Sequence, residues 1–301
     1  MSYTFTSAEK LAALCEEHKV PISEIALRYE MKNGGLSKEE VEHRMETILL
    51  VMHRAIAAAT EEKLKSETGL VGGDAYTLQG AIGPMKDKMI MSDIAVQAMV
   101  WSMATNESNA CGKCIVACPT AGSAGIVPSS LFAVQKRFDL SHDDILAGLL
   151  NTSAIGLIIE ENAMLSGAEG GCQSEDGSAA AMAASAITEM RGGTVEQCLH
   201  AASLSLKNIL GLVCDPLGGL VEVPCVKRTT FMVMNAFTAS DLAMGGVKSA
   251  IPFDDVVDAM RRIGEAMPVA LRETALGGLA TTKTGKRIRK EMAERNKKKK
   301  K

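Results

Sequence analysis

Apolar residues near the start of the chain recur in steps of three and four, the spacing that places side chains on one face of a helix. The clearest stripe consists of Val41, Met45, Ile48, Met52 and Ile56. Residues 37–40 read Ser-Lys-Glu-Glu, a capping-box sequence that predicts the start of this helix. A similar box at residues 6–9 and a proline start at residue 21 predict two earlier helices. Residues 1–68 are therefore expected to form a small helical unit.

The rest of the chain alternates helical segments with loops that are rich in glycine, cysteine and proline. Helices are predicted at about residues 92–104, 128–136, 142–162 and 194–210, with an Ala-rich helix ending at Gly192. The three long loops are residues 106–123, 166–172 and 211–225. No strand–helix alternation is long enough to indicate a parallel sheet. The expected fold class is all-α, with long helices joined by three Gly/Cys/Pro-rich site loops.

Composition and charge support this interpretation and limit the partners. Aromatic residues make up only 3% of the 301 residues, and the 18 methionines favour helices over strands. Residues 286–301 contain ten Lys or Arg and two Glu, a net charge of +8, so the preceding body carries −11 against a total of −3. An acidic body argues against nucleic acid as a partner. No secretory pattern and no run of about 18 apolar residues are found, so no membrane partner is expected and the predicted location is the cytoplasm.

Eight cysteines in a cytoplasmic chain favour metal binding or chemistry over structural disulfides. One set is compact, since Cys111, Cys114 and Cys118 lie within eight residues and a proline follows. Closely spaced thiols suit iron–sulfur ligation, but the spacing differs from a ferredoxin run and a fourth nearby cysteine is missing. Spacing alone leaves a metal role for this set open.

A second set of cysteines is scattered along the chain. Cys172, Cys214 and Cys225 each lie in a loop flanked by glycine or proline. Such loops can fold closely around a bulky cofactor and direct backbone amides toward it. The alternative is that these are three buried thiols that only fill space in the core.

Five longer segments decide between these alternatives. They are Thr105–Ala110, Pro119–Pro128, Glu161–Glu175, Gly211–Cys225 and Leu271–Leu279. In sequence and order they resemble the iron–sulfur-dependent L-serine dehydratases, and the resemblance extends from about residue 21 to 287. It is closest to the alpha subunit of the two-subunit form, which corresponds to the C-terminal catalytic part of single-chain members.

The resemblance implies that Cys172, Cys214 and Cys225 hold a 4Fe-4S cluster with one open iron. Such an iron acts as a Lewis acid on the hydroxyl of L-serine, and elimination leads to pyruvate and ammonia. No pyridoxal phosphate is expected, because neither a well-placed Ser-x-Lys motif nor a supporting strand pattern is found.

The resemblance also suggests the domain organisation. Residues 69–285 are expected to form the cluster-binding catalytic domain, continuous with residues 1–68, and residues 286–301 a basic disordered tail.

Substrate binding is assigned to five polar residues. They are Thr120, Ser123, Asn106, Asn109 and Ser166. The first two lie in the Pro-Thr-Ala-Gly loop and are expected to bind the substrate carboxylate through hydroxyl and backbone N–H groups. The asparagines either orient the substrate or cap a turn, and the third serine either reaches the substrate or stabilises its turn. Lys227 and Arg228 are interpreted as solvated or paired surface charges.

The general base is not identified, because all five histidines fall in predicted helices or caps. The resemblance implies that a beta subunit contributes to substrate handling, so the base is expected from that partner. Two other functions remain open. One is a related cluster-dependent lyase acting on cysteine or threonine. The other is an iron–sulfur electron-transfer or carrier protein that uses Cys111, Cys114 and Cys118, which depart from the family's small or apolar residues.

Overall fold

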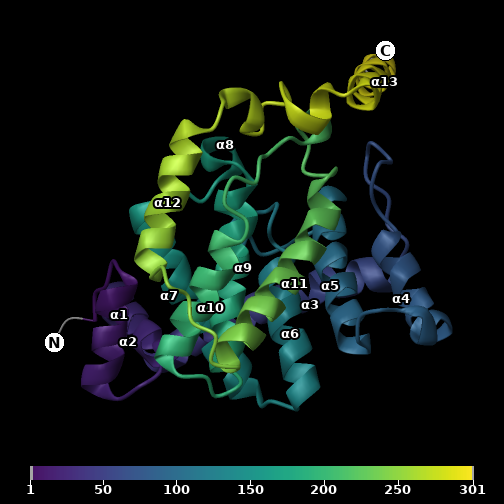
Figure 1. Ribbon diagram of the computed structural model, residues 1–301. Helices are drawn as coiled ribbons and strands as arrows, with labels where there is room; N and C mark the ends of the chain where they lie inside the picture. The colour runs from purple at the N-terminus through teal and green to yellow at the C-terminus, as the bar shows by residue number, and fades with distance from the viewer. Residues whose placement is uncertain (1–2, 300–301) are drawn as a thin grey trace.

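The computed structural model describes residues 3–299, and side chains through residue 295, as an assembly of helices (Figure 1). The longer α-helices are α1 (Ala8–His18), α2 (Ile22–Gly34), α3 (Lys38–Glu61), α4 (Asp74–Met85), α5 (Asp93–Ala110), α6 (Ile126–Phe138), α7 (His142–Asn162), α9 (Cys172–Glu189), α10 (Val195–Lys207), α11 (Cys225–Met244), α12 (Phe253–Ala266) and α13 (Lys283–Lys299). Shorter turns are α8 (Gly167–Gly170), η1 (Lys86–Lys88), η2 (Leu217–Gly219), η3 (Val269–Leu271) and η4 (Gly278–Thr281). No strand forms within residues 3–299, so the all-α prediction is confirmed.

Helix α9 occupies the centre of the molecule, because nearly every one of its side chains is buried. Alanines dominate its middle, and small side chains allow neighbouring helices to approach closely. Helices α7, α10 and α11 pack against α9 and enclose it (Figure 1). This central helix begins at Cys172, so the best-packed element of the fold positions one of the predicted ligands.

Helix starts follow the capping chemistry of the sequence. Ser37 accepts a hydrogen bond from the Glu40 amide while the Glu40 carboxylate accepts one from the Ser37 amide, which confirms the predicted capping box. Thr194 makes the equivalent box with Gln197 at the start of α10. The first helix begins one residue later than predicted, because Ser7 caps α1 through the Lys10 amide.

Several predicted boundaries are wrong. Helix α5 runs to Ala110 rather than to residue 104, so part of the predicted 106–123 loop is helical. Helix α4 was not predicted, and the short helix α8 interrupts the predicted 166–172 loop. These elements are stabilised by tertiary contacts or by buried caps, which a local hydrophobic period does not reveal.

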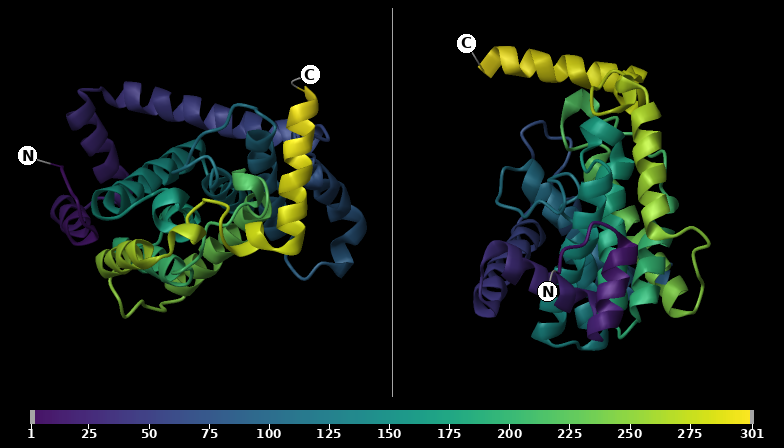
Figure 2. Two further views of the ribbon diagram at one scale, coloured as in Figure 1. Left: turned by 90° about the horizontal axis from the view of Figure 1, so that it is seen from above. Right: turned by 90° about the vertical axis from the view of Figure 1, so that its left-hand side faces the viewer.

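The expected disordered tail is also helical where the structure describes it. Helix α13 covers residues 283–299 and extends away from the body (Figure 2); residues 300 and 301 lie outside the described part. Arg287 pairs with Glu291 one turn later at 2.8 Å, and Arg295 donates to the Thr68 carbonyl at 2.7 Å. Pairs of this spacing stabilise a helix weakly, so even a strongly basic segment can adopt one. The division into residues 1–68 and 69–285 stays a prediction.

None of the helices within residues 3–299 combines the length and apolar content that a membrane-spanning segment requires.

Candidate active site

Two of the three cysteines predicted to hold a cluster begin helices, and the third lies in a loop. Cys172 begins α9, Cys225 begins α11, and Cys214 lies in the loop between α10 and α11. All three are free thiols, and the exposed fractions are 1% for Cys172, 2% for Cys214 and 7% for Cys225. The Cys214 backbone pairs with the segment after α12: its amide donates to the Leu271 carbonyl, and its carbonyl accepts from the Glu273 amide. These two hydrogen bonds hold the Cys214 loop in a fixed position against the segment after α12.

Two of these thiols meet a carboxylate. The Sγ atoms of Cys172 and Cys214 and a carboxylate oxygen of Glu175 all lie within 4.8 Å of one another. Space for this group depends on Gly167, since a methyl group there would lie 2.9 Å from the Cys214 Sγ and 3.1 Å from Glu175 Oε2. Glu175 was not among the predicted site residues. Its position three residues after Cys172 on a helix, and so on the same face, was the available signal.

A guanidinium group stabilises the first of the thiols. Arg228 donates hydrogen bonds to the Cys172 Sγ at 3.0 Å and to the Val213 carbonyl at 2.9 Å. It also pairs with Asp215 at 3.2 Å, and the two side chains are only 15% and 6% exposed. The interpretation of Arg228 as a surface charge is therefore wrong. The sequence could not show that α11 turns this side chain inward toward α9.

Lys227, the neighbour of Arg228, is a paired surface charge as predicted. Its ammonium group contacts Asp74 at 2.6 Å, and both side chains are about half exposed, at 56% and 45%. Exposed pairs of this kind contribute little to stability.

The protonation of the three thiols differs because their surroundings differ. A hydrogen bond from Cys214, together with the Arg228 guanidinium, lowers the pKa of the Cys172 thiol. The pKa of Cys214 is raised, because its proton is held by Cys172 and because it is buried. Burial likewise raises the pKa of Cys225. A metal that displaces these protons would convert all three thiols to thiolates.

The Pro-Thr-Ala-Gly loop adjoins this group. The Thr120 hydroxyl donates a hydrogen bond to Glu175, and the Thr120 and Ser123 hydroxyl oxygens lie 3.1 Å apart. Ser123 is fully buried, whereas Thr120 is partly exposed. Burial raises the pKa of the Glu175 carboxyl, although the Thr120 hydrogen bond opposes this shift. The structure thus brings Thr120 next to the candidate cluster ligands.

The other three substrate candidates make contacts that shape these loops. Asn106 is fully buried, accepts from the Gly125 amide at 2.9 Å and donates to the Gly122 carbonyl. Asn109 donates to the Ala121 carbonyl at 3.3 Å. Ser166 caps α8 by accepting from the Glu169 amide. These contacts account for the turn-stabilising alternative, and substrate binding by the three residues stays a prediction.

The compact cysteine set does not assemble into a second site. Within the described part of the chain, three His, Cys, Asp or Glu side chains that could meet at one ion occur only at Cys172, Glu175 and Cys214. Cys114 is exposed, Cys111 is half-buried, and Cys118 is buried. Because the three thiols differ in exposure, they should differ in their reactivity toward reagents in solution.

Alkylation should distinguish Cys114 from Cys118. Burial raises the pKa of Cys118 to about 12, so at pH 8 only about one thiol in 10,000 is the reactive thiolate. We expect iodoacetamide to modify the exposed Cys114 at least about 100-fold faster than Cys118. Peptide mapping by mass spectrometry over a time course measures both rates. Similar rates would contradict the buried position of Cys118.

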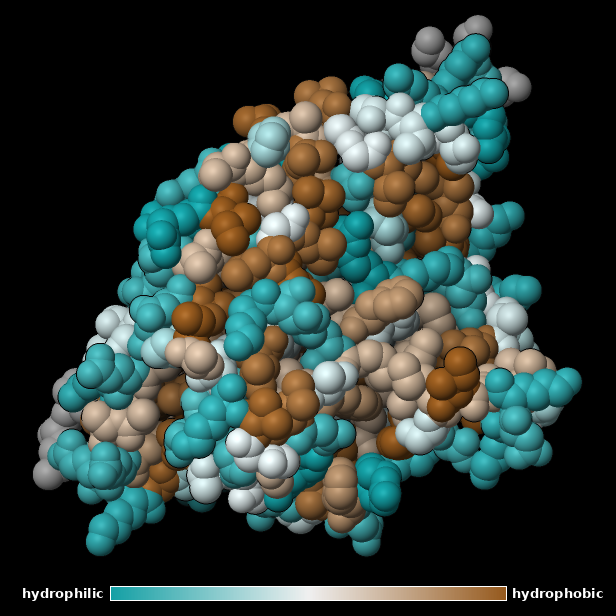
Figure 3. Space-filling view, viewed as in Figure 1, coloured by the Kyte–Doolittle hydropathy of each residue, from teal (hydrophilic) through white to brown (hydrophobic). Residues whose placement is uncertain are grey.

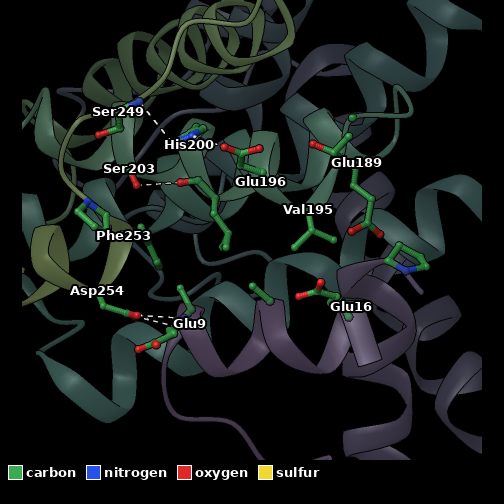
Figure 4. Close-up of a pocket in the computed structure, with 18 of the residues that line it drawn as sticks. Glu9, Glu16, Glu189, Val195, Glu196, His200, Ser203, Ser249, Phe253 and Asp254 are labelled. Atoms are coloured by element: carbon green, nitrogen blue, oxygen red, sulfur yellow. Dashed lines mark hydrogen bonds and ion pairs between the residues drawn. The ribbon is translucent and has the colours of Figure 1, made fainter. Parts of the chain in front are cut away.

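A cavity of about 670 Å³ lies elsewhere, between α1 and α10 (Figure 4). Its walls include the buried Cys15 and the carboxylates of Glu9, Glu16 and Glu196. His200 faces it and accepts a hydrogen bond from the Ser249 amide at 3.3 Å. The lining residues do not include Cys172, Cys214, Cys225 or Glu175, so the cavity and the candidate active site are separate features.

Comparison with known proteins identifies the family of the chain. A family model described as serine dehydratase alpha chain matches residues 17–280, which include all three cluster candidates. The chain belongs to this family. It is 45% identical to the probable L-serine dehydratase alpha chain of Bacillus subtilis strain 168, covering 96% of this chain and 95% of that protein. The L-serine dehydratase alpha chain of Peptoniphilus asaccharolyticus is 44% identical, with 95% and 97% coverage.

Longer relatives contain the same region. The L-serine dehydratase of Streptomyces coelicolor is 36% identical to this chain, and the alignment covers 93% of the chain but 61% of that protein. The resemblance inferred from the sequence motifs is thereby confirmed at the level of the family.

Proposed function

We propose that this serine dehydratase family member deaminates L-serine to pyruvate and ammonia in the cytoplasm, using a 4Fe-4S cluster bound by Cys172, Cys214 and Cys225. The observation that carries the proposal is the close approach of buried Cys172 and Cys214 thiols beside Thr120 and Glu175, in a chain of this family. A related lyase that acts on cysteine or threonine would use the same cluster ligands. Only an activity assay with each amino acid distinguishes it from a serine dehydratase.

The donor set fits such a cluster. Thiolates are the ligands that iron–sulfur clusters take in proteins, and three ligands leave one iron open. Cys225 begins α11 three residues before Arg228, so it lies on the helix face from which Arg228 contacts the Cys172 Sγ. Gly167 allows the close approach of α8 to Cys214, because any larger residue there would collide with the Cys214 Sγ. When bound, the cluster would supply a Lewis acid for the departing hydroxide of serine.

The residues of the chain have separate tasks in this reaction. Arg228 stabilises Cys172 as a thiolate, because it donates to the Sγ and lowers the pKa of that thiol. Thr120 and the neighbouring loop amides would bind the substrate carboxylate, just before the N-terminus of α6, where the helix dipole favours an anion. Loss of the Cα proton and of hydroxide yields aminoacrylate and water, and aminoacrylate tautomerises and hydrolyses to pyruvate and ammonia.

The base that takes the Cα proton is proposed to come from a beta chain. Three histidines have described contacts that lie away from the cysteine loops. His53 stacks on Phe132, and His142 pairs with Glu46. His200 contacts Glu196 and the Ser249 amide. The relatives from Bacillus subtilis and Peptoniphilus asaccharolyticus are called alpha chains, which implies further subunits in those two enzymes.

Exposed apolar side chains near the cysteine loops support this partner. Val269 and Leu276 are 65% and 62% exposed, and both flank the segment that pairs with Cys214. Apolar surface is visible in the upper part of Figure 3, next to the hydrophilic tail helix. Exposed apolar patches beside a site are typical of protein interfaces.

An anaerobic assay tests the proposal. The chain would be co-expressed with its beta chain and reconstituted with iron and sulfide, and pyruvate formed from L-serine, L-threonine and L-cysteine would be measured without pyridoxal phosphate. We expect serine turnover, and we expect Cys172→Ser to lose both turnover and bound iron because one ligand is removed.

Cys114→Ser is the matched control, because Cys114 is exposed and lies outside the thiol group. It should retain iron and activity. Iron loss in Cys114→Ser alone, with no serine turnover in any variant, would instead support the electron-transfer or carrier alternative.

A further inference from the structure

A carboxylate without a cationic partner lies at the edge of the candidate active site. Glu175 is mostly buried but not fully covered. Among the side chains that the structure describes, no Lys, Arg or His makes an ion pair with it, and the charge of Arg228 acts on it only at longer range. Its one hydrogen-bond donor among those side chains is the neutral Thr120 hydroxyl. Buried carboxylates are usually paired with a positive charge, so this one is suited to accept a charge from a ligand.

The surroundings of Glu175 define where such a charge would lie. Its carboxylate oxygen is within 4.8 Å of the Cys172 and Cys214 Sγ atoms. Glycines 122 and 167 face the carboxylate, and a side chain at either position would collide with it: a methyl group at Gly122 would lie 2.9 Å from the Glu175 Cδ. The carboxylate is therefore packed closely against the Gly122 and Gly167 backbone, where only glycine leaves room for it.

Candidate neighbours that could neutralise Glu175 are already engaged. The Arg228 guanidinium donates to Cys172, Val213 and Asp215 and makes no ion pair with Glu175. Lys227 points to Asp74 on the surface. A cationic group on a bound molecule would therefore be the first to pair directly with Glu175.

We propose that Glu175 binds the α-ammonium group of the substrate and so makes the site select α-amino acids over the corresponding acids without an amine. This inference rests on the proposed function and adds a residue to it. In L-serine the amine and the hydroxyl are on adjacent carbons. A carboxylate beside the candidate cluster ligands can hold the amine while the hydroxyl faces the ligands and Thr120 lies near the carboxylate end.

The test compares two ligands that differ only in the amine. 3-Hydroxypropanoate has the hydroxyl and carboxylate of serine but no ammonium group. In the reconstituted alpha–beta enzyme, Glu175→Gln is expected to raise the KM for L-serine about 100-fold, because a charge-assisted contact is lost. The inhibition constant of 3-hydroxypropanoate should change little, since Gln keeps the size and can still accept from Thr120. Iron and sulfide per chain should equal those of the wild type.

Glu265→Gln is the matched control, because it removes the same charge from an exposed pair with Arg261 and should leave both constants unchanged. If Glu175→Gln shifts both ligands equally, or neither, Glu175 does not recognise the amine and the inference is overturned while the proposed function stands. If the wild type turns over no serine, both the inference and the proposed function fail.

Should Glu175→Gln not take up iron, the same two constants are measured for Glu175→Asp. Its shorter carboxylate should weaken serine alone by about tenfold, and an unchanged ratio overturns the inference.

Discussion

Replacing Gly167 with alanine is expected to leave the chain folded but to lower its bound iron about tenfold or more. The added methyl group would lie 2.9 Å from the Cys214 Sγ and 3.4 Å from its Cβ. A cysteine side chain is short, so relieving this overlap requires the thiol to turn away from Cys172. Iron and sulfide analysis after anaerobic reconstitution measures the effect, and far-UV circular dichroism checks the fold.

Gly80→Ala is the matched control for this substitution. Gly80 lies in α4, and nothing lies within 4 Å of the position that the new methyl group would take. This variant should bind iron normally and gain up to about 1 kcal/mol of stability, because alanine favours a helix over glycine. Full iron content in Gly167→Ala would contradict the expectation that the contact between residue 167 and Cys214 limits cluster binding.

Removing the Glu107 side chain is expected to lower the free energy of unfolding by about 3 kcal/mol. Glu107 is fully buried in α5, and its carboxylate accepts from the Gly73 amide at 3.0 Å and the Asp74 amide at 2.8 Å. These amides open α4, so Glu107→Ala would leave buried donors without an acceptor. Urea unfolding of Glu107→Ala measures the loss.

Two comparisons make the Glu107 result specific. Glu107→Gln retains an acceptor oxygen and should lose less stability than the alanine variant. Glu42→Ala removes an exposed carboxylate that pairs with Lys38 at 3.4 Å, and such pairs are worth no more than about 0.5 kcal/mol. If Glu107→Ala were as mild as Glu42→Ala, the buried cap would not stabilise α4.

Much of the fold was predictable because it follows local rules. The capping boxes at Ser37 and Thr194 and the apolar stripe of α3 depend only on neighbours within one or two turns. Helix α4 escaped prediction because its cap comes from Glu107, more than thirty residues later. The helical form of residues 286–299 was missed for a related reason, since composition gave charge but not the contact of Arg295 with Thr68.

The sequence by itself determined the family and the all-α class, because long ordered motifs and helical periodicity are properties of the chain alone. Through the family resemblance it also predicted Cys172, Cys214 and Cys225 as cluster ligands, and that assignment stays a prediction. Only the tertiary structure decided which polar residues join those thiols. Glu175 and Arg228 reach Cys172 from α9 and α11, whereas Asn106 turns to Gly125. The physical reason is that short-range hydrogen bonds and charge pairs depend on how separate helices pack, and packing depends on the whole core.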